Sequence, residues 1–237
     1  MRSAALLFGA VFVAGLAQAD TAYVKPSDFS PDAGQTSTVE VAFNDYCCEP
    51  RYGVRTDTFQ VISSDGPAAP PDRIETFAPK TVLEHTMTGP GTTRISTGER
   101  LGLKGEYVLL DVQYHLVNSP DETLTEIPAG TPILSSQTAT VTDAYVTIGA
   151  QDWGAIRTRI GRLAITPALH PNRVQTGAPF IGRVTLDGAP VADQTLWLSN
   201  ESQRLHGKSG TALKTDADGL FTVTFTQPGV HLIMARL

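Results

Sequence analysis

Apolar and polar residues alternate in short runs along most of this chain, and turn-forming residues separate the runs. Residues 36–43 read TSTVEVAF, with the two valines and the phenylalanine at every second position. Phe221, Val223 and Phe225 alternate with threonines in the same way. A period of two residues is typical of a strand with one buried face, so both segments are predicted to be β-strands.

The last part of the chain, residues 182–237, has the turn chemistry of a small β-sandwich. Asp187-Gly188 and Asp218-Gly219 each separate β-prone runs, and glycine supplies the positive φ that tight hairpin turns need. The final segment is apolar at nearly every position, which predicts a strand buried on both faces.

The middle of the chain holds one long β-prone run, residues 106–118, which reads EYVLLDVQYHLVN. It is predicted to be a single strand with an apolar face and a more polar face that carries Asp111 and His115. Residues four apart in a strand lie about 13 Å from each other. Asp111 and His115 therefore cannot share one ion without a ligand from another strand, and each is interpreted as a solvated or rim residue.

The chain begins with the pattern of a targeting segment. Arg2 is followed by an apolar run and then by the small-residue site Ala17-Gln18-Ala19. The run is short for a membrane span, so residues 1–19 are predicted to be a cleaved signal peptide. The remaining chain is expected to be exported, and periplasmic if the host is Gram-negative.

Composition predicts an all-β protein. Charged residues make up 18% of the chain, glycine and proline together number 37 (21 and 16), and no long segment has the helical period. We expect two immunoglobulin-like or transthyretin-like β-sandwich domains in tandem, residues 20–160 and 161–237. The net charge of −6 without a Lys/Arg cluster argues against nucleic acid or anionic membrane as a partner.

The two cysteines of the chain are adjacent, at Cys47 and Cys48. Adjacent Cα atoms lie about 3.8 Å apart, below the usual range for a disulfide. In an oxidising compartment three interpretations remain open: a strained vicinal disulfide or simple loop packing, a soft-metal or redox site, and pairing between molecules.

Sequence motifs for catalysis are absent. The chain has no GxSxG elbow, no nucleotide-binding glycine loop, no HxxxH and no CxxC. Its five histidines are scattered, with no two closer than 25 residues. The protein is therefore predicted not to be an enzyme.

The order of the segments resembles a known family. The resemblance rests on five stretches: YVKPSDFSPDAGQT (23–36), TATVTDAYVTIG (138–149), GRLAITPALHPN (161–172), GAPFIGRVTLDGAPVADQTLWL (177–198) and TDADGLFTVTFTQPGVHLIMA (215–235). They resemble exported bacterial β-sandwich proteins of unassigned function that are often described as periplasmic components of cobalt or nickel uptake. The last stretch is also similar to transthyretin-like or carboxypeptidase-regulatory sandwiches.

This resemblance implies a periplasmic accessory protein that binds nickel, cobalt or copper for an uptake system. The ligands expected on that basis are Asp20 with its free amine, Cys47, Cys48, His85 and His115. Members of the family often begin with a histidine where this chain has Asp20, which departs from the pattern. The alternative is a non-enzymatic interaction module that partners an envelope transporter or receptor and needs no metal.

Overall fold

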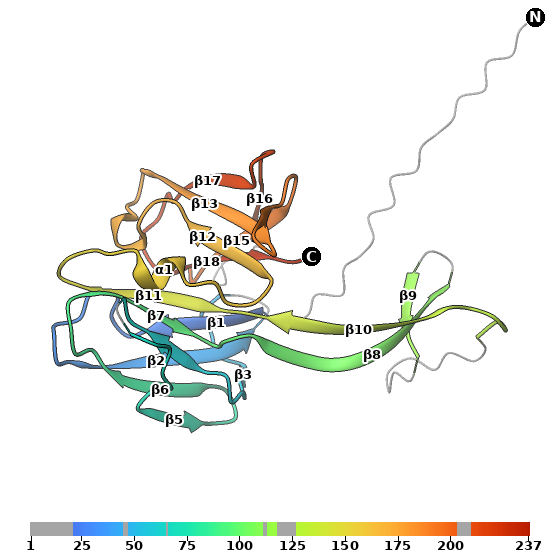
Figure 1. The fold of residues 1–237 in the computed structure, drawn as a ribbon, viewed down its shortest axis with the longest axis horizontal. Coiled ribbons are helices and arrows are strands. Elements are labelled where there is room, and N and C mark those ends of the chain that lie inside the picture. The colour runs from blue at the N-terminus through green and yellow to red at the C-terminus, as the bar shows by residue number, and fades with distance from the viewer. Residues whose placement is uncertain (1–20, 45–46, 65, 111–112, 118–126, 203–209) are drawn as a thin grey trace, which may run out of the picture. The chain divides into compact units, whose positions relative to one another are not determined.

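The computed structural model describes residues 21–44, 47–64, 66–110, 113–117, 127–202 and 210–237. The predicted signal peptide and Asp20 lie outside the described residues. Two compact units are found: a larger one of residues 20–102 and 138–237, and a smaller one whose described residues fall within 103–137. The described residues contain no helix that is long and apolar enough to cross a membrane. The predicted all-β class is confirmed (Figure 1).

The first half of the larger unit packs two antiparallel sheets against each other. One sheet has the order β1-β2-β6-β5 with β3 paired to β2, and the other has the order β11-β7-β4. Their strands are β1 (Thr21–Pro26), β2 (Thr36–Asn44), β3 (Tyr52–Gly53), β4 (Gln60–Ile62), β5 (Arg73–Thr76), β6 (Thr81–Thr86), β7 (Gly91–Ser96) and β11 (Asp143–Ile148). Val39 and Val41 of β2 are fully buried and share a core with Leu83 of β6, as the alternation in this segment requires.

The second half of the larger unit is another pair of sheets with its own core. One sheet has the order β12-β13-β14 with β17 paired to β13, and the other has the order β16-β15-β18. Their strands are β12 (Leu163–Pro167), β13 (Pro179–Leu186), β14 (Ala189–Pro190), β15 (Thr195–Asn200), β16 (Thr211–Lys214), β17 (Leu220–Thr224) and β18 (His231–Ala235). Phe221, Val223 and Phe225 are buried in this core, which confirms the prediction for that segment.

Two local features of this second sandwich test the sequence reasoning. Asp187 and Gly188 have φ values of 52° and 88°, the left-handed pair that a tight hairpin turn between β13 and β14 requires. The final strand differs from the prediction. Every residue of β18 is only half-buried, because β18 pairs with β15 alone and forms the edge of its sheet in the described part of the chain.

The predicted domain division at residues 160 and 161 stays a prediction.

The smaller unit contains most of a third sheet, with the order β10-β8-β9. Its strands are β8 (Arg100–Leu110), β9 (Gln113–Leu116) and β10 (Ile133–Thr140). The prediction of one strand over residues 106–118 is wrong. The chain reverses after Leu110, and β8 and β9 pair antiparallel with Val108 opposite His115. Asp111 lies outside the described residues.

Candidate functional site

The cysteines predicted as metal ligands are bonded to each other. Cys47 and Cys48 form a vicinal disulfide directly after β2, with Cα atoms 3.7 Å apart, and Cys48 has a φ of 71°. Of the three interpretations, the structure has the vicinal disulfide. In this state neither sulfur is a thiolate, the form that binds soft metals.

His85 lies in β6 opposite Ser37 of β2. Its Nδ1 atom is 3.3 Å from Oδ1 of Asp72, close enough for an ion pair when the ring is charged, but without the angles of a hydrogen bond. Asp72 also accepts a hydrogen bond from the backbone N–H of Thr86, 2.7 Å away. This bond lowers the pKa of Asp72, and the charge of His85 adds to the effect while burial opposes it. His85 and Asp72 therefore form a contact near the surface that offers two candidate ligands for a metal ion.

The other predicted ligands do not complete a metal site. His115 lies in β9 of the smaller unit, whereas His85 and the disulfide belong to the larger unit. Asp20 lies outside the described residues. Across the part of the chain that is described, no group of three His, Cys, Asp or Glu side chains is placed to hold a metal ion.

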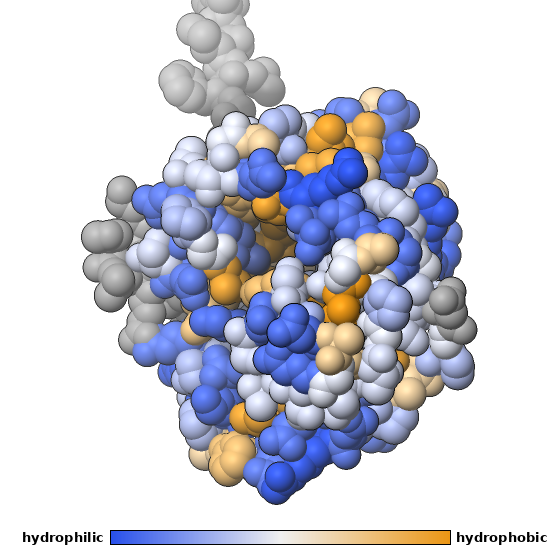
Figure 2. Space-filling model, turned by 90° about the vertical axis from the view of Figure 1, so that its left-hand side faces the viewer, coloured by the Kyte–Doolittle hydropathy of each residue, from blue (hydrophilic) through white to orange (hydrophobic). Residues whose placement is uncertain are grey.

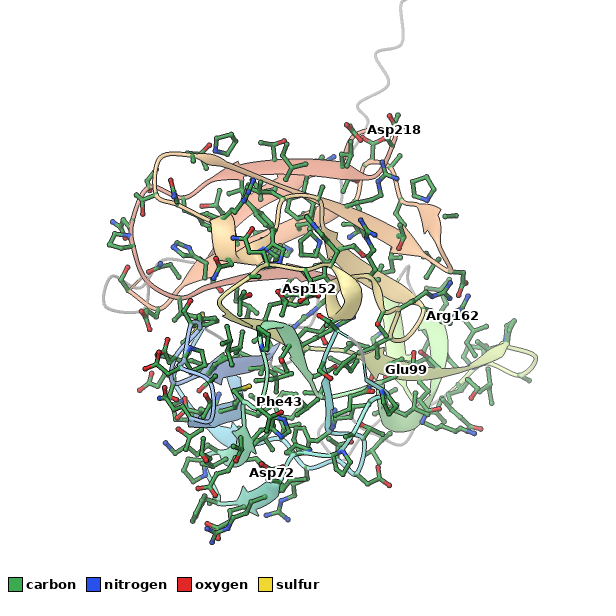
Figure 3. The ribbon with its side chains drawn as sticks, turned by 60° about the vertical axis from the view of Figure 1, so that its left-hand side comes forward. Phe43, Asp72, Glu99, Asp152, Arg162 and Asp218 are labelled. Carbon is green, nitrogen blue, oxygen red and sulfur yellow. A yellow bond between two sulfur atoms is a disulfide. The ribbon has the colours of Figure 1, made fainter. Side chains whose placement is uncertain are left out.

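Asp152 contacts both a serine and a histidine that are distant from it in the sequence, Ser64 and His170. Asp152 lies next to the short helix α1 (Gly154–Arg157), between the two sandwiches of the larger unit (Figure 3). Its carboxylate accepts hydrogen bonds from the hydroxyl of Ser64 and from the backbone N–H groups of Thr92 (2.6 Å) and Gly154 (3.1 Å). Burial alone would raise the pKa of Asp152, but these three bonds hold it below its usual value.

His170 reaches the same point from the second sandwich and is only 2% exposed. Its Nε2 atom lies 2.9 Å from the backbone carbonyl oxygen of Asp152 and 3.0 Å from Oγ1 of Thr92. Its Nδ1 atom accepts a hydrogen bond from the N–H of Asn172, 3.2 Å away. Nδ1 is therefore unprotonated in this arrangement, and the ring hydrogen is on Nε2.

This cluster differs from a catalytic triad in its connections. Ser64 donates to the carboxylate of Asp152 and not to the imidazole, and both nitrogens of His170 are occupied by bonds to other groups. The bonds instead join β7 to the residues before α1 and after β12. The cluster is a buried polar joint that fixes the second sandwich against the first.

The smaller unit has a different kind of surface. Four large apolar side chains are exposed on its two long strands: Leu103 (96% exposed) and Leu109 (46%) on β8, and Ile133 (55%) and Leu134 (46%) on β10. Leu103 and Leu109 are six residues apart in β8 and share a face by strand alternation. We call these four residues the apolar ribbon patch. The face shown in Figure 2 is in contrast mostly hydrophilic, with hydrophobic residues in small separate groups.

Sequence reasoning missed both features for a physical reason. His170 meets Thr92 across 78 residues of chain, which no local pattern reports. The alternation around Leu103 indicates a strand, but it does not show whether another sheet covers that face.

The fold and these surfaces define an all-β sandwich protein with a buried polar joint and a strand pair rich in exposed apolar residues. The chain belongs to the family described as a domain of unknown function (DUF4198), whose model matches residues 17–237. No curated protein and no solved structure matches it.

Proposed function

We propose that this protein is a non-enzymatic interaction module of the periplasm that docks onto an envelope transporter or receptor. The observation that carries the proposal is the apolar ribbon patch. By strand alternation Ile133 and Leu134 lie on opposite faces, so only one of them shares the face of Leu103 and Leu109. Large apolar side chains left uncovered on one strand pair mark a surface that a partner can bury. Leu103, with 96% of its surface exposed, is the most exposed residue of this patch.

The neighbouring side chains favour a protein partner over a lipid surface. Within β8, Glu106 offsets one of the two cations Arg100 and Lys104, so the strand carries a net charge of only +1. The whole chain has a net charge of −6. Binding to anionic lipid is driven by basic residues beside an apolar face, and that combination is missing here.

The edge of the sheet gives the partner a mode of binding. Among the described strands β10 pairs with β8 only, so it forms an edge of its sheet. Residues 135–138 of β10 are polar and exposed, between the apolar residues Ile133 and Leu134 and the start of the larger unit. A partner strand could add to this edge by backbone hydrogen bonds while its side chains cover the leucines.

Site-specific photo-crosslinking tests this proposal. A benzophenone amino acid is placed at Leu103, and a matched control carries it at Ile74, an exposed residue of the edge strand β5 in the larger unit. The expected result is one discrete adduct from Leu103 and none from Ile74. The partner found in this adduct is then purified. Calorimetry measures the affinity of this partner for the wild-type protein and for a Leu103→Ser/Ile133→Ser variant. Equal crosslinking from both positions, or unchanged affinity of the variant, would refute docking through the patch.

Transition-metal carriage, the function that the resemblance implies, has less support from the geometry. The sulfurs of Cys47 and Cys48 are bonded to each other, and His85 is paired with Asp72. The deciding measurement is a calorimetric titration with nickel, cobalt, copper and zinc, first oxidised and then with the cysteines reduced. Stoichiometric sub-micromolar binding would establish a metal carrier, and binding only after reduction would place Cys47 and Cys48 among the ligands.

A further inference from the structure

A cavity of about 170 Å³ lies between the two sandwiches of the larger unit. Three segments line it: β7 and β11 of the first sandwich, the residues from Ile156 to Ile160, and β12 and β13 of the second sandwich. Binding sites for small molecules occur preferentially at such domain junctions. Its volume suits a molecule much smaller than a nucleotide or a sugar chain.

The wall of this cavity is cationic. Arg94, Arg157 and Arg159 all line it, and no lining residue is an aspartate or glutamate. Two carboxylates behind the wall compensate part of the charge, because Arg94 pairs with Asp143 and Arg159 lies 3.4 Å from Asp187. Asp187 also pairs with Arg162, 2.6 Å away, so the two carboxylates do not balance the guanidinium groups and the junction keeps a net positive charge.

Arg157 supplies this uncompensated charge. It is the last residue of α1, its guanidinium lies 5.7 Å from the ring centre of Trp153, and within the described ranges it has no ion-pair partner. An exposed guanidinium at the mouth of a cavity offers several N–H donors in a planar fork that matches the oxygens of a carboxylate or phosphate.

Arg94 is held in a fixed position below it. Its side chain is 6% exposed, and it donates to the carboxylate of Asp143 and to the backbone carbonyl of Thr158. The Nε atom of Arg94 and Oδ1 of Asp143 are buried without a hydrogen-bond partner in the described structure. Both atoms belong to the same ion pair, so we attribute them to an incomplete fork-to-fork contact and do not count them as ligand groups.

Hydroxyl groups complete the wall. Tyr145, Thr166 and Thr185 line the cavity from β11, β12 and β13. Burial raises the pKa of Tyr145 to about 12, so its hydroxyl keeps its hydrogen at neutral pH. Arginine, tyrosine and threonine residues around a small space supply the kinds of donor that bind oxygen anions.

We propose that this cavity is a binding site for a small oxyanion, a carboxylate or an inorganic phosphate or sulfate, held chiefly by Arg157 and Arg159 above the fixed cation Arg94. The site lies in the larger unit and does not rest on the docking function of the apolar ribbon patch. A bound anion would contact both sandwiches, so it would also stabilise their junction.

The proposal is tested by calorimetric titration of the purified protein with phosphate, sulfate and acetate at constant ionic strength. The test variants are Arg157→Gln and Arg159→Gln, whose side chains are exposed. The matched control is Arg162→Gln, because Arg162 also pairs with Asp187 but does not line the cavity (Figure 3). Removing a charged donor is expected to weaken binding about tenfold or more.

The expected result is saturable binding of at least one of the three anions to the wild type and to Arg162→Gln, with weaker binding in both test variants. Preference for phosphate and sulfate identifies an inorganic ligand, and preference for acetate identifies a carboxylate. Absence of binding by all three anions, or an equal loss in Arg162→Gln, would overturn the proposal. Arg94→Lys keeps the buried charge and serves as a check that the junction itself remains folded.

Discussion

β2 and β8 have the same alternating pattern, and yet their apolar side chains meet different environments. Val39 and Val41 of β2 are fully buried because the sheet β11-β7-β4 covers them, with Ile95 and Val146 in the same core. Leu103 of β8 is 96% exposed. Periodicity therefore determines which residues share a face of a strand, while the cover over that face comes from distant parts of the chain or from another molecule.

The largest difference between the two regions is expected in the free energy of unfolding. Leu83 lies opposite Val39 in the first core and is 1% exposed, so Leu83→Ala should destabilise the protein by about 2–5 kcal/mol. The cost combines lost burial and the cavity that remains. Urea unfolding followed by tryptophan fluorescence measures it. A cost below about 1 kcal/mol would mean that this core can collapse around the gap.

A smaller loss is expected at the polar joint. His170→Ala would leave the carbonyl of Asp152 and the N–H of Asn172 without their partner, at a cost of about 2 kcal/mol. The hydroxyl of Thr92 would keep its bond to Thr147. Asn172→Ala is the matched control, since it removes an exposed side chain but keeps the N–H that bonds His170. Its cost should stay within about 0.5 kcal/mol. Equal costs for the two variants would show that His170 does not join the sandwiches.

The same joint predicts a dependence on acid. The pKa of Asp152 is lowered in the folded protein relative to its usual value of 3.8, so the unfolded chain takes up its proton first as the pH falls. The stabilisation is complete above pH 3.8 and is lost as the pH falls through the folded value. Asp152→Asn should be less stable than the wild type at pH 7, by less than His170→Ala.

The pH dependence of the stability difference between the wild type and Asp152→Asn serves as the control. The difference in stability between the wild type and Asp152→Asn should shrink as the pH falls below 3.8, because Asp152 becomes protonated first in the unfolded chain and then in the folded protein. Denaturant titrations between pH 7 and pH 2.5 measure the difference. A gap that stays constant across this range would assign the effect of the substitution to packing and not to the carboxylate.

The fold was predictable where local chemistry is sufficient. Alternation located Phe221 and its neighbours in a buried strand, and the Asp187-Gly188 pair located a hairpin turn. The prediction of one strand over residues 106–118 was wrong, because the apolar residues of this run continue through the point at which the chain reverses between β8 and β9. A strand pair and a single long strand have the same period of two, so the pattern cannot separate them.

The candidate sites were less predictable because they depend on distant contacts. The adjacency of Cys47 and Cys48 raised three possibilities, and only the three-dimensional structure selects the vicinal disulfide. Arg94 and Thr158 are 64 residues apart in the chain, and their contact forms only when the segment after α1 packs against β7. The sequence contains these residues without any local sign that they meet at one junction.

The smallest effect on stability, and the sharpest test of the comparison with β2, is expected at the apolar ribbon patch. Leu103→Ser removes a side chain that is almost fully exposed, so the free energy of unfolding should change by less than about 0.5 kcal/mol. The same substitution should weaken the binding of the purified envelope partner in calorimetry, whereas Ile74→Ser should leave that affinity unchanged. A cost above about 1 kcal/mol in the isolated protein would show that Leu103 is already covered by its own chain. Unchanged stability together with loss of partner binding would show that another protein supplies the burial that Leu103 lacks in the isolated chain.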